Sequence, residues 1–247
     1  MILSVMYLKT TPGSSSTALI QLWRQSPKLH ARKEIPSMKQ SIIISLAIAL
    51  CASAAMHAQT IHTSTYDGCG PTGSATRPQE KYLNPFKNRD QAPAPSDINK
   101  NIKLTGMLMS GEDKNRYDNH MAAQITGYVA SAKVGGIESC NCKAKDLPHR
   151  DTHIDIVLSP NDYGSAKRHV IVEVTPRIRK LMAAQGKDWS TPTLHQKLPG
   201  HLVRFTGWMF YDTEHRPQCF NTAPNNPNDW RATAWEIHPV TNIEILK

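Results

Sequence analysis

Residues 169–186 read HVIVEVTPRIRKLMAAQG, and the spacing of apolar residues changes within this stretch. Valines at every second position predict a β-strand over 169–174 whose valines face a core. Thr175 then suits a helix N-cap, with Pro176 at the first helical position. The stretch therefore predicts a strand followed directly by a helix that ends near Gly186.

Four other stretches carry the pattern of β-strands, at residues 123–132, 152–158, 202–211 and 233–246. The second of these alternates most clearly, and we expect Ile154, Ile156 and Leu158 to face the core. Gly127 predicts a bend in the first of them, and Pro239 predicts an interruption in the last.

The predicted order is three strands, one helix and two strands, all within residues 106–247. This is the layout of an OB-fold, a five-stranded Greek-key barrel with a helix between its third and fourth strands. The expected fold class is therefore all-β with one helix. Another small barrel and an open α+β sheet are the alternatives.

Five segments of this region read ESCNC (138–142), DTHIDI (151–156), VEVTPR (172–177), VRFTGW (203–208) and WEIHPV (235–240). Together they resemble a group of uncharacterised bacterial exported proteins with an OB-fold-like domain. The resemblance covers residues 106–247. It implies the same fold and no particular activity.

An export signal precedes this region. A positive start at Lys39, an apolar run over 42–50 and small residues up to Ala58 predict a signal peptide over 38–58. The expected location is the periplasm or the outside of the cell. The apolar run is shorter than the roughly 20 residues needed to cross a bilayer, so we expect no transmembrane segment in the mature protein.

The segments on either side of the signal carry little pattern. Residues 1–37 are basic and rich in serine, which indicates an extension from a start codon placed too early. Residues 59–105 contain many Gly, Pro, Asn and Ser residues and no sustained apolar period. We expect them to form a linker or lightly ordered arm.

The net charge of the chain comes mostly from its first 58 residues. The whole sequence has 29 Lys and Arg and 20 Asp and Glu, a net charge of +9. Residues 1–58 hold six of these basic residues and one of the acids, so residues 59–247 carry only +4. The high isoelectric point is therefore weak support for nucleic-acid binding by the mature protein.

Four cysteines follow the signal peptide, and each is a disulfide candidate: Cys69, Cys140, Cys142 and Cys219. An even number permits two disulfides in an exported chain. Cys140 and Cys142 are too close in a strand to pair comfortably with each other. The alternative is a zinc site formed by these two with His149 and His153, at a spacing shorter than in zinc fingers.

Polar residues alternate with the core residues on the second, third and fifth predicted strands, which are neighbours in an OB-fold barrel. Their outward members are His153, Asp155, Glu173, Glu236 and His238. We expect these five side chains, the His/acid cluster, to converge on one outer surface. Imidazoles with carboxylates suit zinc, manganese or iron, and mostly carboxylate ligands suit magnesium or calcium. The alternative is a solvated face with cross-strand pairs.

Three further residues are expected near the His/acid cluster. Arg204 and Trp208, on the fourth predicted strand, should lie at its border. His215 opens the long loop that joins the fourth and fifth strands, and such loops often bind ligands in OB-folds. We therefore count all three with the cluster as ligand-binding candidates.

Two functions are consistent with these features. The first is an exported OB-fold binding protein whose ligand is an oligonucleotide, an oligosaccharide or a partner protein. The second is a metal-dependent hydrolase, a phosphodiesterase or nuclease, that uses the His/acid cluster. A structural role in the cell envelope is a third hypothesis.

Sequence motifs do not decide between these functions. The sequence has no GxSxG nucleophile motif, no Walker loop and no HExxH metalloprotease motif. Binding ranks first because most OB-folds are binding scaffolds, although a fold does not fix a function. An acidic surface would repel phosphate unless a cation intervenes, so a nucleic-acid ligand favours the hydrolase.

Overall fold

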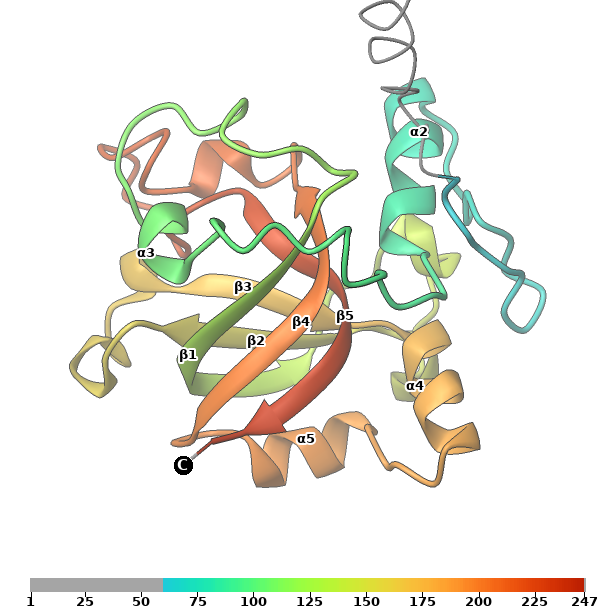
Figure 1. Cartoon of the computed structure of the whole chain (residues 1–247). Helices are drawn as coiled ribbons and strands as arrows, with labels where there is room; N and C mark the ends of the chain where they lie inside the picture. Colours follow the sequence, from blue (N-terminus) through green and yellow to red (C-terminus); the bar gives the residue numbers. More distant parts are fainter. Residues whose placement is uncertain (1–59, 247) are drawn as a thin grey trace, which may run out of the picture. The chain divides into compact units, whose positions relative to one another are not determined.

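Residues 60–246 are described by the structure, a computed structural model (Figure 1). Its strands are β1 (Ala122–Val134), β2 (Thr152–Val157), β3 (Val170–Val174), β4 (Leu202–Tyr211) and β5 (Trp235–Ile245). They form one closed barrel in the order β1-β2-β3-β5-β4, in which only β3 and β5 pair in parallel. The predicted five-stranded all-β barrel is confirmed. The predicted signal peptide and the extension before it lie outside the described residues.

The inward-facing side chains at alternate positions of β2 and β3 fill the barrel interior. Ile154 and Ile156 on β2, like the valines of β3, are fully buried in one apolar core. The inward orientation predicted for Leu158 is wrong, because β2 ends at Val157 and the chain turns away into a short helix at Pro160. Leu158 is 46% exposed.

Two helices connect β3 to β4: α4 (Pro176–Ala184) and α5 (Thr191–Lys197). The Thr175 hydroxyl caps α4 by accepting a hydrogen bond from the Ile178 amide at 3.3 Å. Gly186 follows α4 with a φ of +74°, a conformation that glycine adopts without strain. The local capping signals therefore account for both ends of α4.

Short 3-10 helices interrupt the connections in the described part of the chain. They are η1 (Ser139–Asn141), η2 (Leu147–His149), η3 (Pro160–Asp162), η4 (Ala166–Arg168) and η5 (Arg216–Gln218). Within residues 60–246, no helix has the length and apolar character needed to cross a membrane.

The arm before the barrel is more ordered than the sequence indicates. It forms α2 (Pro78–Lys87) and α3 (Leu104–Met107), where we expected no regular structure. The buried face of α2 includes Asn84, which donates hydrogen bonds to the Thr72 carbonyl at 2.8 Å and the Ser139 hydroxyl at 3.0 Å. Because polar contacts with distant segments hold this helix, no apolar period marks it in the sequence.

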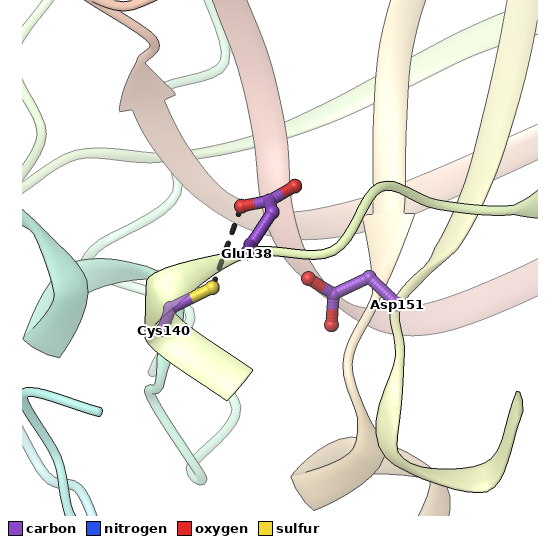
Figure 2. A group of neighbouring side chains, drawn as sticks. All are labelled: Glu138, Cys140 and Asp151. Carbon is purple, nitrogen blue, oxygen red and sulfur yellow. Dashed lines mark hydrogen bonds between the residues drawn. The ribbon is translucent and has the colours of Figure 1, made fainter. Parts of the chain in front are cut away.

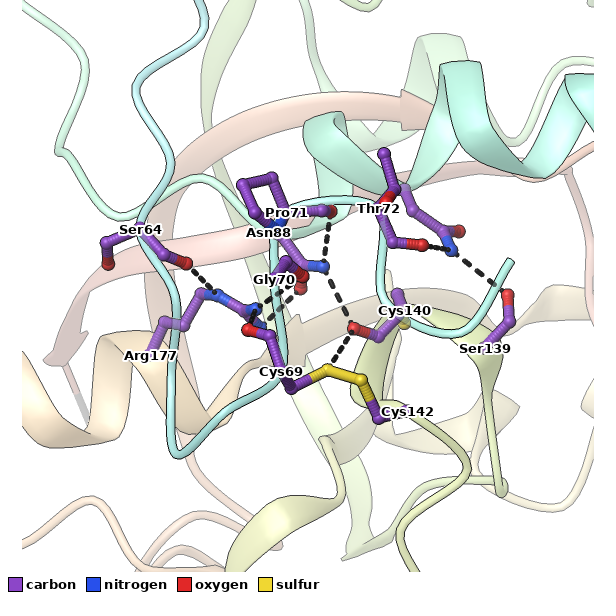
Figure 3. Close-up of a disulfide and its surroundings, with 11 residues drawn as sticks. Ser64, Cys69, Gly70, Pro71, Thr72, Asn88, Ser139, Cys140, Cys142 and Arg177 are labelled. Atoms are coloured by element: carbon purple, nitrogen blue, oxygen red, sulfur yellow. Dashed lines mark hydrogen bonds between the residues drawn. A yellow bond between two sulfur atoms is a disulfide. The ribbon is translucent and has the colours of Figure 1, made fainter. Parts of the chain in front are cut away.

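A disulfide and a buried arginine attach the arm to the barrel (Figure 3). Cys69 of the arm is bonded to Cys142, which follows η1. Arg177 of α4 donates hydrogen bonds to the Asn88 side chain at 2.7 Å and to the Cys69 carbonyl at 2.8 Å. Of the four disulfide candidates, Cys140 and Cys219 are free thiols, and both are buried.

The β4–β5 pairing changes register beside Pro239, but β5 continues through this residue. Gly207 lies opposite, and a Cβ atom on it would lie 2.3 Å from the Pro239 carbonyl oxygen and 2.6 Å from the Ile237 side chain. Only glycine fits there without movement of the backbone. The close approach of β4 and β5 therefore requires glycine at position 207.

Candidate metal centre

The five residues of the His/acid cluster lie together on the outer side of β2, β3 and β5. His153 pairs across the strands with Glu173, and their Nδ1 and Oε1 atoms are 2.9 Å apart. His238 Nδ1 lies 3.2 Å from Glu236 Oε2 and 3.4 Å from Glu173 Oε2. Asp155 Oδ1 lies 3.4 Å from His153 Nε2. A continuous polar chain therefore runs along this side of the barrel.

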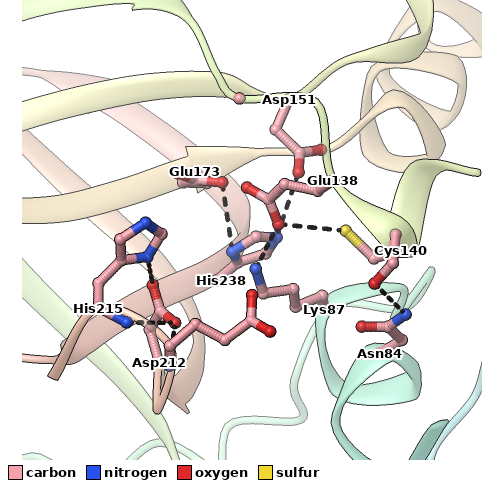
Figure 4. A network of polar contacts seen from close by, with 12 residues as sticks. Asn84, Lys87, Glu138, Cys140, Asp151, Glu173, Asp212, His215 and His238 are labelled. Carbon is pink, nitrogen blue, oxygen red and sulfur yellow. Dashed lines mark hydrogen bonds and ion pairs between the residues drawn. The ribbon is translucent and has the colours of Figure 1, made fainter. Parts of the chain in front are cut away.

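The cluster is buried, whereas the sequence predicts an exposed outer surface. His153 is 8% exposed, the three carboxylates are 2–4% exposed, and His238 is fully buried. The expected exposure is wrong because α2 packs against β5 and η1, and Trp230 of the loop between β4 and β5 lies against His153. Lys87 of α2 and Glu138 approach the cluster from this cover (Figure 4).

The two residues expected at the border do not join the cluster. Arg204 forms an ion pair with Glu244 at 2.8 Å near the other end of β5. The Trp208 indole donates a hydrogen bond to the Gln91 carbonyl at 2.8 Å, and the Arg89 guanidinium stacks 4.4 Å from its ring. Both side chains are therefore engaged away from the His/acid cluster.

Asp151 completes a group of three possible metal ligands with Glu173 and His238, and we call this group the ligand triad. All three side chains are buried, and one ligand atom from each lies within 4.8 Å of the others. Both carboxylate oxygens of Asp151 lack a hydrogen-bond partner, as do Glu173 Oε2 and His238 Nε2. Asp151 Oδ2 lies 3.7 Å from His238 Nε2.

Sequence reasoning missed Asp151, although the signal was present. Asp151 immediately precedes β2, and residues 151, 153 and 155 follow the period of two that places side chains on one face. Extending the alternation by one step beyond the predicted strand would have added this carboxylate to the His/acid cluster.

A second group of possible ligands shares Asp151 with the triad (Figure 2). It contains Glu138 and Cys140, and the Cys140 thiol donates a hydrogen bond to Glu138 Oε2 at 3.4 Å. Burial raises the pKa of Cys140 well above its ordinary value, so this thiol keeps its proton. Lys87 forms an ion pair with Glu138. The Cys140 proton and the Lys87 ammonium group therefore already contact Glu138, where a metal ion would have to bind.

The zinc site considered for Cys140 and Cys142 with two histidines is not formed. Cys142 is bonded to Cys69. His149 bridges Asp67 and Asp146 at the surface, and His153 belongs to the His/acid cluster.

Two buried cations partly balance the acidic groups. Arg231 donates a hydrogen bond to Glu236 Oε1 at 2.6 Å and lies 3.3 Å from Asp212 Oδ2. Burial alone would lower the pKa of Lys87, but the charge on Glu138 and other nearby acids raises it well above its ordinary value. Lys87 and Arg231 are therefore permanent positive charges in this region.

Burial and charge act in opposite directions on the ligand triad. Burial raises the pKa of Asp151 above its ordinary value, and the charge of His238 offsets this only in part. Burial also acts to raise the pKa of Glu173, but His238 and His153 bring it below its ordinary value. Burial alone would lower the pKa of His238, whereas Glu173 and Glu236 raise it to about 9. Asp151 is thus the poorly compensated member of the triad.

The donor set of the triad fits a divalent cation. One imidazole nitrogen with carboxylate oxygens is a ligand set that zinc, manganese and iron accept. Binding would release the proton from His238 Nε2 and supply charge and coordination to the unpartnered oxygens of Asp151. Glu173, the remaining ligand, also lines a neighbouring pocket.

Comparisons with protein-family models, with curated proteins and with solved structures found no match to this chain.

The pocket beside the triad, which we call the site pocket, has a volume of about 600 Å³. His153, Glu173 and Glu236 line it from the barrel, and His215 and Trp230 line it from the β4–β5 loop. The Trp230 ring contacts both imidazoles, with ring centres 5.8 Å from His153 and 5.3 Å from His215. His215 therefore lines the same pocket as three members of the His/acid cluster.

Replacing Asp155 by asparagine should lower the free energy of unfolding by about 2 kcal/mol at pH 7. Burial alone would raise the pKa of Asp155, but hydrogen bonds from His153 and His169 hold it well below its ordinary value. A carboxylate with a depressed pKa stabilises the folded state above its unfolded pKa of about 4, and this stabilisation is lost as the pH falls.

Urea unfolding at several pH values measures this effect. The difference between wild type and Asp155→Asn should narrow between pH 5 and pH 3. A control outside the cluster, the partly exposed Asp162→Asn, should change stability by less than about 0.5 kcal/mol throughout. A difference that stays constant down to pH 3 would contradict the role assigned to the Asp155 charge.

Proposed function

We propose that this chain is an exported metal-dependent hydrolase that acts on phosphodiesters, built on an OB-fold-like barrel. The observation that carries the proposal is the ligand triad, in which Asp151, Glu173 and His238 are buried with ligand atoms that lack hydrogen-bond partners. These atoms have long ion-pair contacts with one another and no hydrogen bonds. Burying charged groups without hydrogen bonds costs free energy, so their presence favours a ligand that is bound in the working protein.

Burial of the His/acid cluster weighs against the binding hypothesis on this face. A binding protein would need the outer side of β2, β3 and β5 to be open to an extended ligand. Instead, α2 and the segment around η1 cover it, and the site pocket provides the access. A pocket of about 600 Å³ beside a bound cation suits chemistry on one bond better than docking of a long chain.

A divalent ion held by the triad would activate water and stabilise negative charge on a phosphoryl group. The chain's own cations support this substrate class. Lys87 and Arg231 line the site pocket together with the two imidazoles, His153 and His215. Once an ion offsets the carboxylates, these groups can receive an anionic substrate, which the carboxylates alone would repel.

Two features support the proposed export and the proposed OB-fold. The Cys69–Cys142 disulfide is consistent with an oxidising compartment, and therefore with the export signal expected over residues 38–58. The strand order of the barrel, with α4 and α5 between β3 and β4, is consistent with an OB-fold.

Removal of metal should abolish the activity. We expect the purified protein to bind about one zinc or manganese ion and to hydrolyse bis(4-nitrophenyl) phosphate, with activity lost on dialysis against a chelator and restored by the ion. Elemental analysis, calorimetric titration of the metal-free protein and the nitrophenolate assay measure these points. If no divalent ion binds and chelation leaves the rate unchanged, the proposed function is wrong.

A further inference from the structure

His215 lies in the site pocket and has one ring nitrogen held by a buried carboxylate (Figure 4). Its Nδ1 lies 2.5 Å from Asp212 Oδ2. The His215 side chain is 41% exposed, whereas that of Asp212 is only 5% exposed. Because Asp212 engages Nδ1, the nitrogen available to a molecule in the pocket is Nε2.

The orientation of His215 is fixed from several sides. Asp212 Oδ1 accepts hydrogen bonds from the backbone amides of Glu214 at 3.1 Å and His215 at 3.4 Å. Trp230 packs edge-on against the imidazole, with an angle of 83° between the rings. The Trp230 indole in turn donates a hydrogen bond to Gln218 Oε1 at 2.9 Å. The imidazole is therefore held in place before any ligand arrives.

A chain of polar contacts joins His215 to the ligand triad. Arg231 lies between Asp212 and Glu236, with Nη1 at 3.3 Å and 2.6 Å from their carboxylate oxygens. Glu236 Oε2 then lies 3.2 Å from His238 Nδ1. One connected polar network therefore includes both His215 and the candidate metal ligand His238.

We infer that His215 is the general acid of the proposed reaction and protonates the leaving group of a phosphodiester. This inference rests on the proposed function. The oxygen of water bonds to phosphorus, the bond from phosphorus to the leaving alcohol oxygen breaks, and that oxygen takes the proton from His215 Nε2. The proton lost by the water is released to solvent, and His215 regains a proton from solvent.

The charge state of His215 suits this role. The hydrogen bond to Asp212 raises the pKa of His215 above its ordinary value. Burial and Arg231 act in the opposite direction, and Glu236 acts in the same direction as Asp212. The imidazolium form is therefore well populated near neutral pH, as a general acid requires.

The same role defines the substrate class. Aryl leaving groups such as nitrophenolate are stable as anions and gain little from protonation. Aliphatic alkoxides, including the hydroxyl oxygens of sugars, are poor leaving groups without a proton. A site with a positioned acid therefore fits phosphodiesters of aliphatic alcohols.

Two substrates with different leaving groups test the inference. His215→Gln should slow hydrolysis of a dinucleoside monophosphate by about 10²- to 10⁴-fold and hydrolysis of bis(4-nitrophenyl) phosphate by less than about tenfold. The basic limb of the pH–rate profile for the dinucleotide should disappear in this variant. His201→Gln, an exposed histidine outside the pocket, is the matched control and should leave both rates unchanged.

Asp212→Asn is a second variant that keeps the imidazole. It should show the same preference for the aryl substrate, with the basic limb moved to lower pH. Equal losses on both substrates would overturn the role of His215 while leaving the proposed function in place. A wild-type protein that binds the ion and hydrolyses neither substrate would overturn the proposed function, and this inference with it.

Discussion

Asp151→Asn should reduce the affinity for zinc or manganese by about 100-fold or more and the hydrolysis rate by roughly 10³-fold. Asparagine keeps the shape of the side chain but removes one negative charge and one anionic ligand atom from the triad. Calorimetric titration and the nitrophenolate assay measure the two losses. Unchanged affinity and rate would exclude Asp151 from the metal centre.

The same variant should not destabilise the metal-free protein. The Asp151 carboxylate is 1% exposed and has no hydrogen-bond partner, so ionising it in this environment is costly. A neutral amide removes that cost, and we expect the free energy of unfolding without metal to be equal or higher. Loss of function with retained stability separates a ligand from a structural residue. Asp162→Asn on η3, outside the cluster, is the control and should change neither property.

Loss of the Cys69–Cys142 disulfide should lower the free energy of unfolding by about 4 kcal/mol, as expected for a bond between residues 73 positions apart. The Cys69→Ser/Cys142→Ser double variant tests this by urea unfolding. Reductant should weaken the wild type to the same level and have no further effect on the double variant. A wild-type stability that does not respond to reductant would contradict the prediction.

The Cys69–Cys142 disulfide should also affect metal binding at the ligand triad. The disulfide holds the arm next to η1, and the arm carries α2 with Lys87. Because Lys87 pairs with Glu138 above the ligand triad, release of the arm would expose the cluster to water and weaken every electrostatic contact within it. We therefore expect metal affinity to fall in the double variant as well.

Alternation of side chains predicted which polar residues face outward, and the strand order of an OB-fold predicted that they share a face. His153, Glu173 and Glu236 were assigned to the outer side of their strands from the period of two alone, and the structure brings them together. The capping residues Thr175 and Gly186 likewise marked the ends of α4. These are properties of neighbouring residues along the chain, so short windows of sequence carry them.

The environment of that face could not be predicted in the same way. The arm was expected to be lightly ordered because it has no sustained apolar period. Contacts with segments distant in sequence order it, both polar ones such as Asn84 with Ser139 and apolar ones such as Leu104 in the barrel core. The disulfide partner of Cys69 could not be predicted because it also lies far away in the sequence. A residue's burial depends on what packs over it, and local periodicity does not contain that information.

The side of its strand on which each polar residue lies thus follows from spacing along the chain, since β geometry repeats every two residues. Docking of α2 and η1 over that side decides that the carboxylates are enclosed, that Asp151 and Lys87 join them, and that His215 faces a pocket. Contacts between segments 50 or more residues apart make this cover, such as those of Lys87 with Glu138 and of Cys69 with Cys142. Long-range packing in the folded chain therefore changes a polar strand surface into a candidate metal centre.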